Sequence, residues 1–216
     1  GVLNLTHRTS HEFPQPLVPG ETVEATVILD QCAYRVPAGH RLRVAVSTAY
    51  WPMIWPSPEP VALSLSAATL VLPVRPTAGG DEWTFPAPEA AAPGRTQTLR
   101  KTASSRIAAR DQATGIVTLT IADDFGEVRD LEHGLVHGSA VNETWTIAPD
   151  DPLSASVEIA WTQTFSRDGW SVRTETTSSM TADGENFDLR GTIRAYEGEK
   201  PVFEREFAEK RSRNNV

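Results

Sequence analysis

The 216-residue sequence lacks several features that mark secreted and membrane proteins. Its one cysteine, Cys32, excludes an internal disulfide and is compatible with a reducing compartment. No apolar run reaches the ~18–20 residues of a membrane helix, and no basic segment followed by an apolar run indicates a signal peptide. We therefore expect no membrane partner and a cytoplasmic location.

Basic charge is also scarce. The chain has 20 Lys and Arg against 28 Asp and Glu, a net charge of -8. Positive and negative side chains balance up to Arg75, so all of the excess negative charge follows that residue. Because a net acidic chain repels phosphate backbones, we expect no nucleic-acid partner.

Motifs for catalysis or metal binding are absent. The nucleophile of an α/β-hydrolase sits in G-x-S-x-G, and the nearest fragment here, Gly138-Ser139-Ala140, is better explained as a turn. His133 and His137 are four residues apart, but the surrounding glycines favour an extended chain, in which that spacing separates residues by ~13 Å. We predict no catalytic residue, no metal site and no cofactor, and an inactive chain when alone.

The sequence does contain stretches in which apolar and polar residues alternate with a period of two. It predicts strands at 21–29, 40–48 and 61–71, and, from about residue 100, longer strands joined by tight turns. Asp168-Gly169 is the strongest hairpin signal, and residues 123–126 are predicted to turn as well. The second half therefore reads as an antiparallel β-meander with one apolar face and a charged outer face.

A loop rich in aromatic residues and proline follows the predicted strand at 40–48. Its prolines exclude a sheet interior, and its large apolar side chains must be buried against something. We predict that they form a docking loop, with packing onto their own module as the alternative. The residues of this docking loop are Tyr50, Trp51, Met53, Ile54 and Trp55.

Four stretches between residues 1 and 75 carry a family resemblance: LNLTHR, PLVPGE, AYRVPAGHRLRVAVSTAYWP and WPSPEPV. In this order they resemble the C-terminal region of the CocE/NonD-type hydrolases, the X-Pro dipeptidyl-peptidase-like serine enzymes that include bacterial cocaine esterase. The resemblance implies a non-catalytic jelly-roll (galactose-binding-like) domain. It also implies a partner, an α/β-hydrolase catalytic domain upstream in the same polypeptide that carries the Ser, His and Asp.

A polar cluster near the N-terminus, His7, Arg8, His11 and Glu12, lies within the resembling region. Because that region corresponds to a non-catalytic domain, we interpret these residues as contacts that pin a loop and not as an acid/base group.

The sequence thus predicts an all-β protein: a partial jelly-roll β-sandwich at 1–75, a Pro/Gly-rich linker at 76–99, an antiparallel β-meander sheet or barrel at 100–210 and a polar tail at 211–216. The function it favours is the non-catalytic part of a serine hydrolase acting on ester or amide bonds. The alternatives are a stand-alone carbohydrate- or small-ligand-binding module and a ligand-binding barrel formed by the second half. Homo-oligomer formation stays open.

Overall fold

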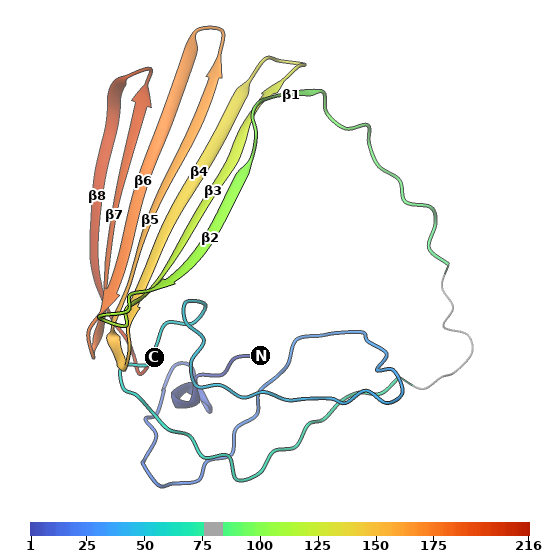
Figure 1. Cartoon of the computed structure of the whole chain (residues 1–216), viewed down its shortest axis with the longest axis vertical. Helices are drawn as coiled ribbons and strands as arrows, with labels where there is room; N and C mark the ends of the chain where they lie inside the picture. The colour runs from blue at the N-terminus through green and yellow to red at the C-terminus, as the bar shows by residue number, and fades with distance from the viewer. Residues whose placement is uncertain (76–83) are drawn as a thin grey trace.

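The computed structural model describes residues 1–75 and 84–216. Its strands form one open antiparallel sheet of eight, and residues 1–75 gather at one end of that sheet (Figure 1). The predicted all-β class is confirmed. Of the two predicted forms of the second half, the sheet is right and the barrel is wrong, because the strands at the two edges do not pair with each other.

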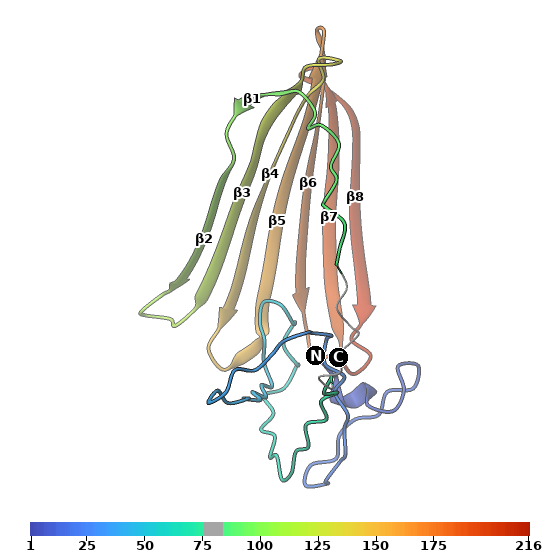
Figure 2. The ribbon, with the colours of Figure 1, turned by 90° about the vertical axis from the view of Figure 1, so that its right-hand side faces the viewer.

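The strands follow the order β1-β3-β4-β5-β6-β7-β8, and β2 also pairs with β3 (Figure 2). β1 and β2 lie end to end against β3, so together they form one interrupted edge strand. The bounds are β1 Thr96–Arg100, β2 Ala103–Arg110, β3 Val117–Asp130, β4 Val136–Ala148, β5 Asp151–Arg167, β6 Trp170–Ala182, β7 Asn186–Glu197 and β8 Lys200–Ser212.

Short turns connect successive strands from β3 to β8. Asp168 (φ 51°) and Gly169 (φ 83°) join β5 to β6, as predicted. Positive φ at both central positions matches the right-handed twist of the flanking strands. In the β7–β8 turn, Gly198 takes positive φ (57°). Each strand therefore finds its partner next to it in the sequence.

The predicted turn at residues 123–126 is wrong. β3 runs through this position without reversing, and its register against β4 shifts between Asp124 and Glu127. The one extra residue of β3 forms a β-bulge, in which Gly126 takes φ 80° and donates its N–H to Asp124 Oδ1. Several turn types and the G1 type of bulge both place a glycine at positive φ, so the glycine signal alone does not separate a turn from a bulge.

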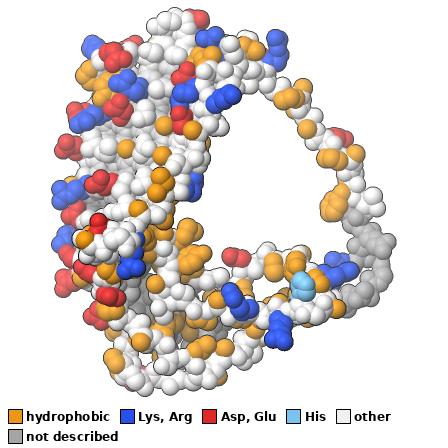
Figure 3. All heavy atoms as spheres, in the orientation of Figure 1, with side chains coloured by type: hydrophobic (Ala, Val, Ile, Leu, Met, Phe, Trp, Pro, Cys, Tyr) orange, Lys and Arg blue, Asp and Glu red, His pale blue; other side chains and the backbone are white. Residues whose placement is uncertain are grey.

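The two faces of the sheet differ in chemistry. One row of paired residues places Val141, Trp161 and Ile193 on the first face. The adjacent row places Asn142, Ala160 and Thr192 on the second face. The first face is largely apolar, whereas the second carries Thr, Ser and charged residues. Figure 3 shows these charges gathered along the outer side of the sheet. This confirms the predicted charged outer face.

The predicted strands at 21–29, 40–48 and 61–71 are not formed. In the part of the chain that the structure describes, residues 1–75 contain one regular element, the 3-10 helix η1 Leu5–His7. The apolar side chains that would face a sandwich core are exposed, including Leu42 (63%) and Val46 (70%). A strand needs a neighbour for its backbone hydrogen bonds, and none of the described segments supplies one here.

The predicted linker falls partly outside the described residues, which exclude 76–83 and with them Trp83. Residues 84–95 form no helix or strand, but β1 begins at Thr96, earlier than the predicted boundary at 99/100. Phe85 in this segment is 80% exposed. No helix in the described ranges is long and apolar enough to cross a membrane.

Candidate functional site

Arg213 is where the irregular N-terminal region meets the end of the sheet. Its side chain is 3% exposed and is the one buried charged group among the described residues. One guanidinium nitrogen donates to the carbonyl of Pro56, directly after the docking loop, at 2.6 Å, and the others donate to Asp183 O (3.2 Å) and Val216 O (2.9 Å). The guanidinium also lies 4.9 Å from the centre of the Phe187 ring. One side chain thus joins the docking loop, the β6–β7 turn and the C-terminus.

The pKa values of two residues at this junction, Arg213 and Asp183, are shifted. Burial lowers the pKa of Arg213, and the nearby charge of Asp183 opposes that effect. The pKa of Asp183 itself is lowered to about 2, first because its carboxylate accepts the N–H groups of Glu185 and Asn186, and then because Lys210 lies 3.2 Å away. Asp183 therefore holds the β6–β7 turn in shape while it is ionised.

The N-terminal helix η1 also reaches the C-terminal tail. Thr6 Oγ1 donates to Asn215 O at 2.6 Å, and Asn4 Nδ2 donates to the same oxygen at 3.3 Å. His7 Nε2 lies 3.1 Å from Asn214 O. Figure 1 shows the two termini at the same end of the molecule. The segment predicted as a polar tail at 211–216 is therefore a meeting point of distant parts of the chain.

The docking loop is split between half-buried and exposed side chains. Trp51 and Trp55 are half-buried, and the Nε1 atom of each is shielded from solvent without a hydrogen-bond acceptor. Tyr50 (66%), Met53 (77%) and Ile54 remain exposed. Buried indole N–H groups usually find an acceptor, so this packing leaves polar groups unsatisfied. The docking role itself stays a prediction.

The predicted loop-pinning cluster is brought together only in part. Arg8 donates to Leu5 O (3.0 Å) and Gln15 O (3.1 Å), which fixes the chain between these residues. The rings of His7 and His11 lie 5.6 Å apart. Glu12 is exposed, and its backbone N–H donates to Ser10 Oγ. Loop pinning remains a prediction for the cluster as a whole.

The apolar face of the sheet is incompletely covered. Val141 and Val157 near its centre are buried, but Trp161, Phe165 and Phe207 on the same face are about 40% exposed. Phe125 stacks on Trp161 with 5.8 Å between ring centres and adds some cover. A one-layer sheet buries one face only when a second layer packs against it. This face is therefore a candidate contact surface.

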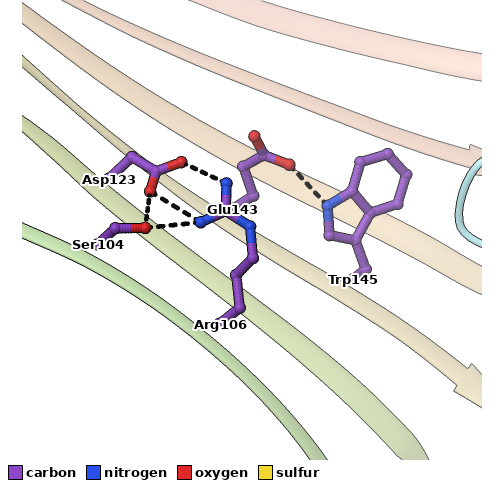
Figure 4. Close-up of polar contacts among 5 residues, drawn as sticks. All are labelled: Ser104, Arg106, Asp123, Glu143 and Trp145. Carbon is purple, nitrogen blue, oxygen red and sulfur yellow. Dashed lines mark hydrogen bonds and ion pairs between the residues drawn. The ribbon is translucent and has the colours of Figure 1, made fainter.

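A charged cluster interrupts the apolar face near the β2 edge (Figure 4). Arg106 forms two hydrogen bonds with the Asp123 carboxylate, at 3.0 and 2.8 Å, and Ser104 Oγ contacts both side chains. On the neighbouring strand, Trp145 Nε1 donates to Glu143 at 2.8 Å. None of these five residues was predicted to be a site residue from the sequence. Their strand positions are predictable, but the cross-strand register that joins them is not.

The chemistry open to this cluster is limited. Hydrogen bonds from Arg106 and Ser104 lower the pKa of Asp123, which makes it a poor proton acceptor for the serine hydroxyl. His133 lies at the β3–β4 turn, 3.3 Å from Asp130, and His137 lies on β4. The turn expected at Gly138-Ser139-Ala140 is wrong, because these residues are inside β4 and pair with β5. Across 1–75 and 84–216, no three His, Cys, Asp or Glu side chains are close enough to hold a metal ion. The absence of catalytic, metal and cofactor sites stays a prediction.

Arg213 was missed because sequence patterns place it in a polar C-terminal tail. The available signal was weak: an arginine directly after a strand whose neighbours in the sheet include aromatic residues. Its burial depends on the approach of Pro56, which is 157 residues away in the chain. Sequence spacing cannot reveal a contact of that kind.

Comparison with known proteins places the chain in a family. The model of the X-Pro dipeptidyl-peptidase C-terminal non-catalytic domain matches residues 1–114, more than half of the sequence. The match runs through the predicted linker and ends beyond β2, so it includes the whole interrupted edge strand. No curated protein and no solved structure matches. The resemblance seen in the sequence is confirmed, and the chain belongs to the X-Pro dipeptidyl-peptidase C-terminal non-catalytic domain family.

Proposed function

We propose that this chain is the non-catalytic C-terminal portion of a CocE/NonD-type serine hydrolase acting on ester or amide bonds. In this role it packs against an α/β-hydrolase catalytic domain upstream in the same polypeptide and shapes it. The observation that carries the proposal is the family match, because the matched domain is by its description a C-terminal, non-catalytic one. A bacterial, cytoplasmic enzyme is the setting that we propose.

Uncovered apolar surface supports the packing role. The docking loop and the apolar face both leave large side chains exposed, including Met53 at 77%. Soluble monomers rarely leave contiguous patches of this kind open, so these surfaces are suited to a partner. The strands predicted in residues 1–75 also lack neighbouring strands to pair with. We propose that they complete a jelly roll once further strands pair with them.

The gene sequence immediately upstream of Gly1 provides the direct test. We expect a coding region with G-x-S-x-G after a predicted strand, since that turn exposes the nucleophile of this hydrolase fold. An upstream region that encodes no such motif contradicts the proposal. The 216-residue chain alone should not hydrolyse a p-nitrophenyl ester, and turnover that disappears on replacing one of its own serines would also contradict it.

The docking loop can be tested in the full-length enzyme. Trp51→Ser/Trp55→Ser and Tyr50→Ser/Met53→Ser should both lower activity and weaken domain docking, and the second pair should leave the melting of the isolated chain unchanged. Phe13→Ser is the matched control, an exposed aromatic outside the loop. If the tryptophan variant melts much earlier as an isolated chain while the full enzyme keeps its activity, the loop belongs to the local core.

The domain boundaries are also part of the proposal. We keep a jelly roll at 1–75, a linker at 76–99, a β-meander at 100–210 and a tail at 211–216. The family match up to residue 114 favours a closer link between the two modules, because β2 belongs to the matched region and pairs along β3. Limited proteolysis should cut first within 76–95, and a first cut inside 156–195 would contradict this division.

A stand-alone binding module is the second candidate. The contact between Trp145 and Glu143, next to the Arg106–Asp123 pair, places an aromatic ring beside carboxylates, a combination that suits a sugar or another small polar ligand. Titration of the chain with mono- and oligosaccharides, monitored by tryptophan fluorescence and calorimetry, tests this function. Saturable binding that is lost in Glu143→Gln but kept in Glu132→Gln would favour it over the hydrolase role.

A further inference from the structure

β8 is a long strand with one side open. It covers 13 residues and pairs with β7, and in the described part of the chain no segment pairs with its other side. Every residue of β8 is exposed. The opposite edge is interrupted between β1 and β2, so the backbone row offered by β8 is the longer one. Such an edge is a template for pairing with another strand.

The side chains of β8 are complementary to a second copy of β8. When two copies run antiparallel with Phe207 on the two-fold axis, Arg205 of each copy lies opposite Glu209 of the other. In the same register Phe207 lies opposite its own equivalent, and Glu204 lies opposite Lys210. Within each copy Glu204 also contacts Arg194 (2.8 Å) and Lys210 contacts Asp183 (3.2 Å), so this second pair joins two existing ion pairs. A symmetric interface uses each pair twice, which gives four pairs of opposite charge. Opposite charges directly across an antiparallel pair are stabilising.

Neighbouring registers do not share this property. Moving the axis to Glu206 places that carboxylate opposite its own equivalent. Moving it to Ala208 places Arg205 opposite Arg211. Like charges directly opposite each other destabilise strand pairing. Of these three registers, only the one centred on Phe207 has pairs of opposite charge and no like charges facing each other.

The faces of the sheet also match across this axis. A two-fold axis perpendicular to the sheet keeps the apolar face of one copy continuous with that of the other. Phe207 lies on the apolar face, in the same row as Ile159, and is 40% exposed. The Arg205 guanidinium lies 4.7 Å from the Phe207 ring centre, and Glu209 lies 3.0 Å from Arg211. Arg205 and Glu209 are both exposed, as is the rest of β8.

We propose that the chain forms a symmetric homodimer through antiparallel pairing of β8 with β8, centred on Phe207. The two eight-stranded sheets become one continuous sheet, and the partner is a second copy of this chain. The interface is independent of the hydrolase assignment, because it uses residues beyond the matched family domain.

Charge exchange tests the register. The full chain should be a dimer by light scattering and sedimentation, and Arg205→Glu or Glu209→Arg alone should weaken dimerisation at least ~10-fold, because each places like charges opposite each other twice. A 1:1 mixture of the two variants should recover dimers, since every affected pair then has opposite charges. Arg190→Glu on β7 is the control and should stay dimeric. A monomeric wild-type chain, or single variants that dimerise as well as their mixture, would overturn the proposal.

A cysteine placed on the axis gives a second measurement. In a Cys32→Ser background, Phe207→Cys should form an intermolecular disulfide under mild oxidation, because residues directly opposite in an antiparallel pair lie ~4.5–5.5 Å apart at Cα. Ile107→Cys on the β2 edge, which is also exposed, is the matched control. Equal crosslinking at both positions would contradict β8 pairing, and circular dichroism verifies that each variant keeps the sheet.

Discussion

The two halves of this chain carry the same alternating pattern but fold differently. Residues 1–75 contain apolar alternation and form no strand, whereas residues 96–212 form the whole sheet. The difference lies in where each segment finds its partner. Between β3 and β8 every partner is the next strand in the sequence, and the connecting loops are short (Figure 2). Short loops cost little entropy to close, whereas segments without a local partner depend on distant strands.

Introducing a charge at an apolar position should produce the largest difference in unfolding free energy between the sheet and residues 1–75. Val157→Asp places a carboxylate at a side chain that is 5% exposed in the middle of the sheet, and we expect a loss of roughly 3–5 kcal/mol of unfolding free energy. Val44→Asp, where the native side chain is 60% exposed, should leave the melting curve unchanged. Thermal melting followed by circular dichroism measures both. Equal effects would mean that residues 1–75 pack as tightly as the sheet.

Removing Arg213 should break the connection between the regions. Arg213→Ala leaves the carbonyls of Pro56, Asp183 and Val216 without their donor, and we expect a cost of about 1–3 kcal/mol. Hydrogen exchange should accelerate in the docking loop and in the β6–β7 turn. Arg211→Ala, an exposed arginine two residues earlier, is the control. If Arg211→Ala accelerates exchange as much, the junction does not depend on Arg213.

The bulge in β3 tests how far the sheet depends on local backbone geometry. A Cβ at Gly126 would lie 2.6 Å from Arg100 O, and φ is +80°, so Gly126→Ala should cost about 1–2 kcal/mol. Gly184→Ala meets nothing within 4 Å and should have little effect. Chemical denaturation of both variants gives the comparison. A neutral Gly126→Ala would show that β3 can straighten and lose the bulge.

The smallest expected effect is on acid stability. The pKa of Asp183 is lowered to about 2 in the folded chain, so its contribution is fully present above its unfolded pKa near 3.8 and is lost as pH falls through about 2. Between about pH 4 and pH 2, Asp183→Asn should therefore flatten the dependence of the melting temperature on pH. Asp188→Asn is the control on the next strand. An unchanged slope in Asp183→Asn would show that other carboxylates dominate in this range.

Sequence periodicity and turn chemistry by themselves determined the β-meander. The period of two sets which side chains share a face, and Asp168-Gly169 sets one register through its own backbone angles. The family was also readable, because its motifs lie within continuous stretches of residues 1–75. All of these signals are local, so no knowledge of the folded chain is needed to use them.

Only the tertiary structure decided the openness of the sheet, the bulge at Gly126 and the junction at Arg213. An open sheet and a closed barrel share the same local pattern, and they differ in whether the first and last strands meet. Arg213 is buried by a loop 157 residues away, and Arg106 meets Asp123 through the pairing of β2 with β3. The strands expected before residue 75 are absent for the same physical reason, because hydrogen bonds between strands belong to pairs of segments and not to either segment alone.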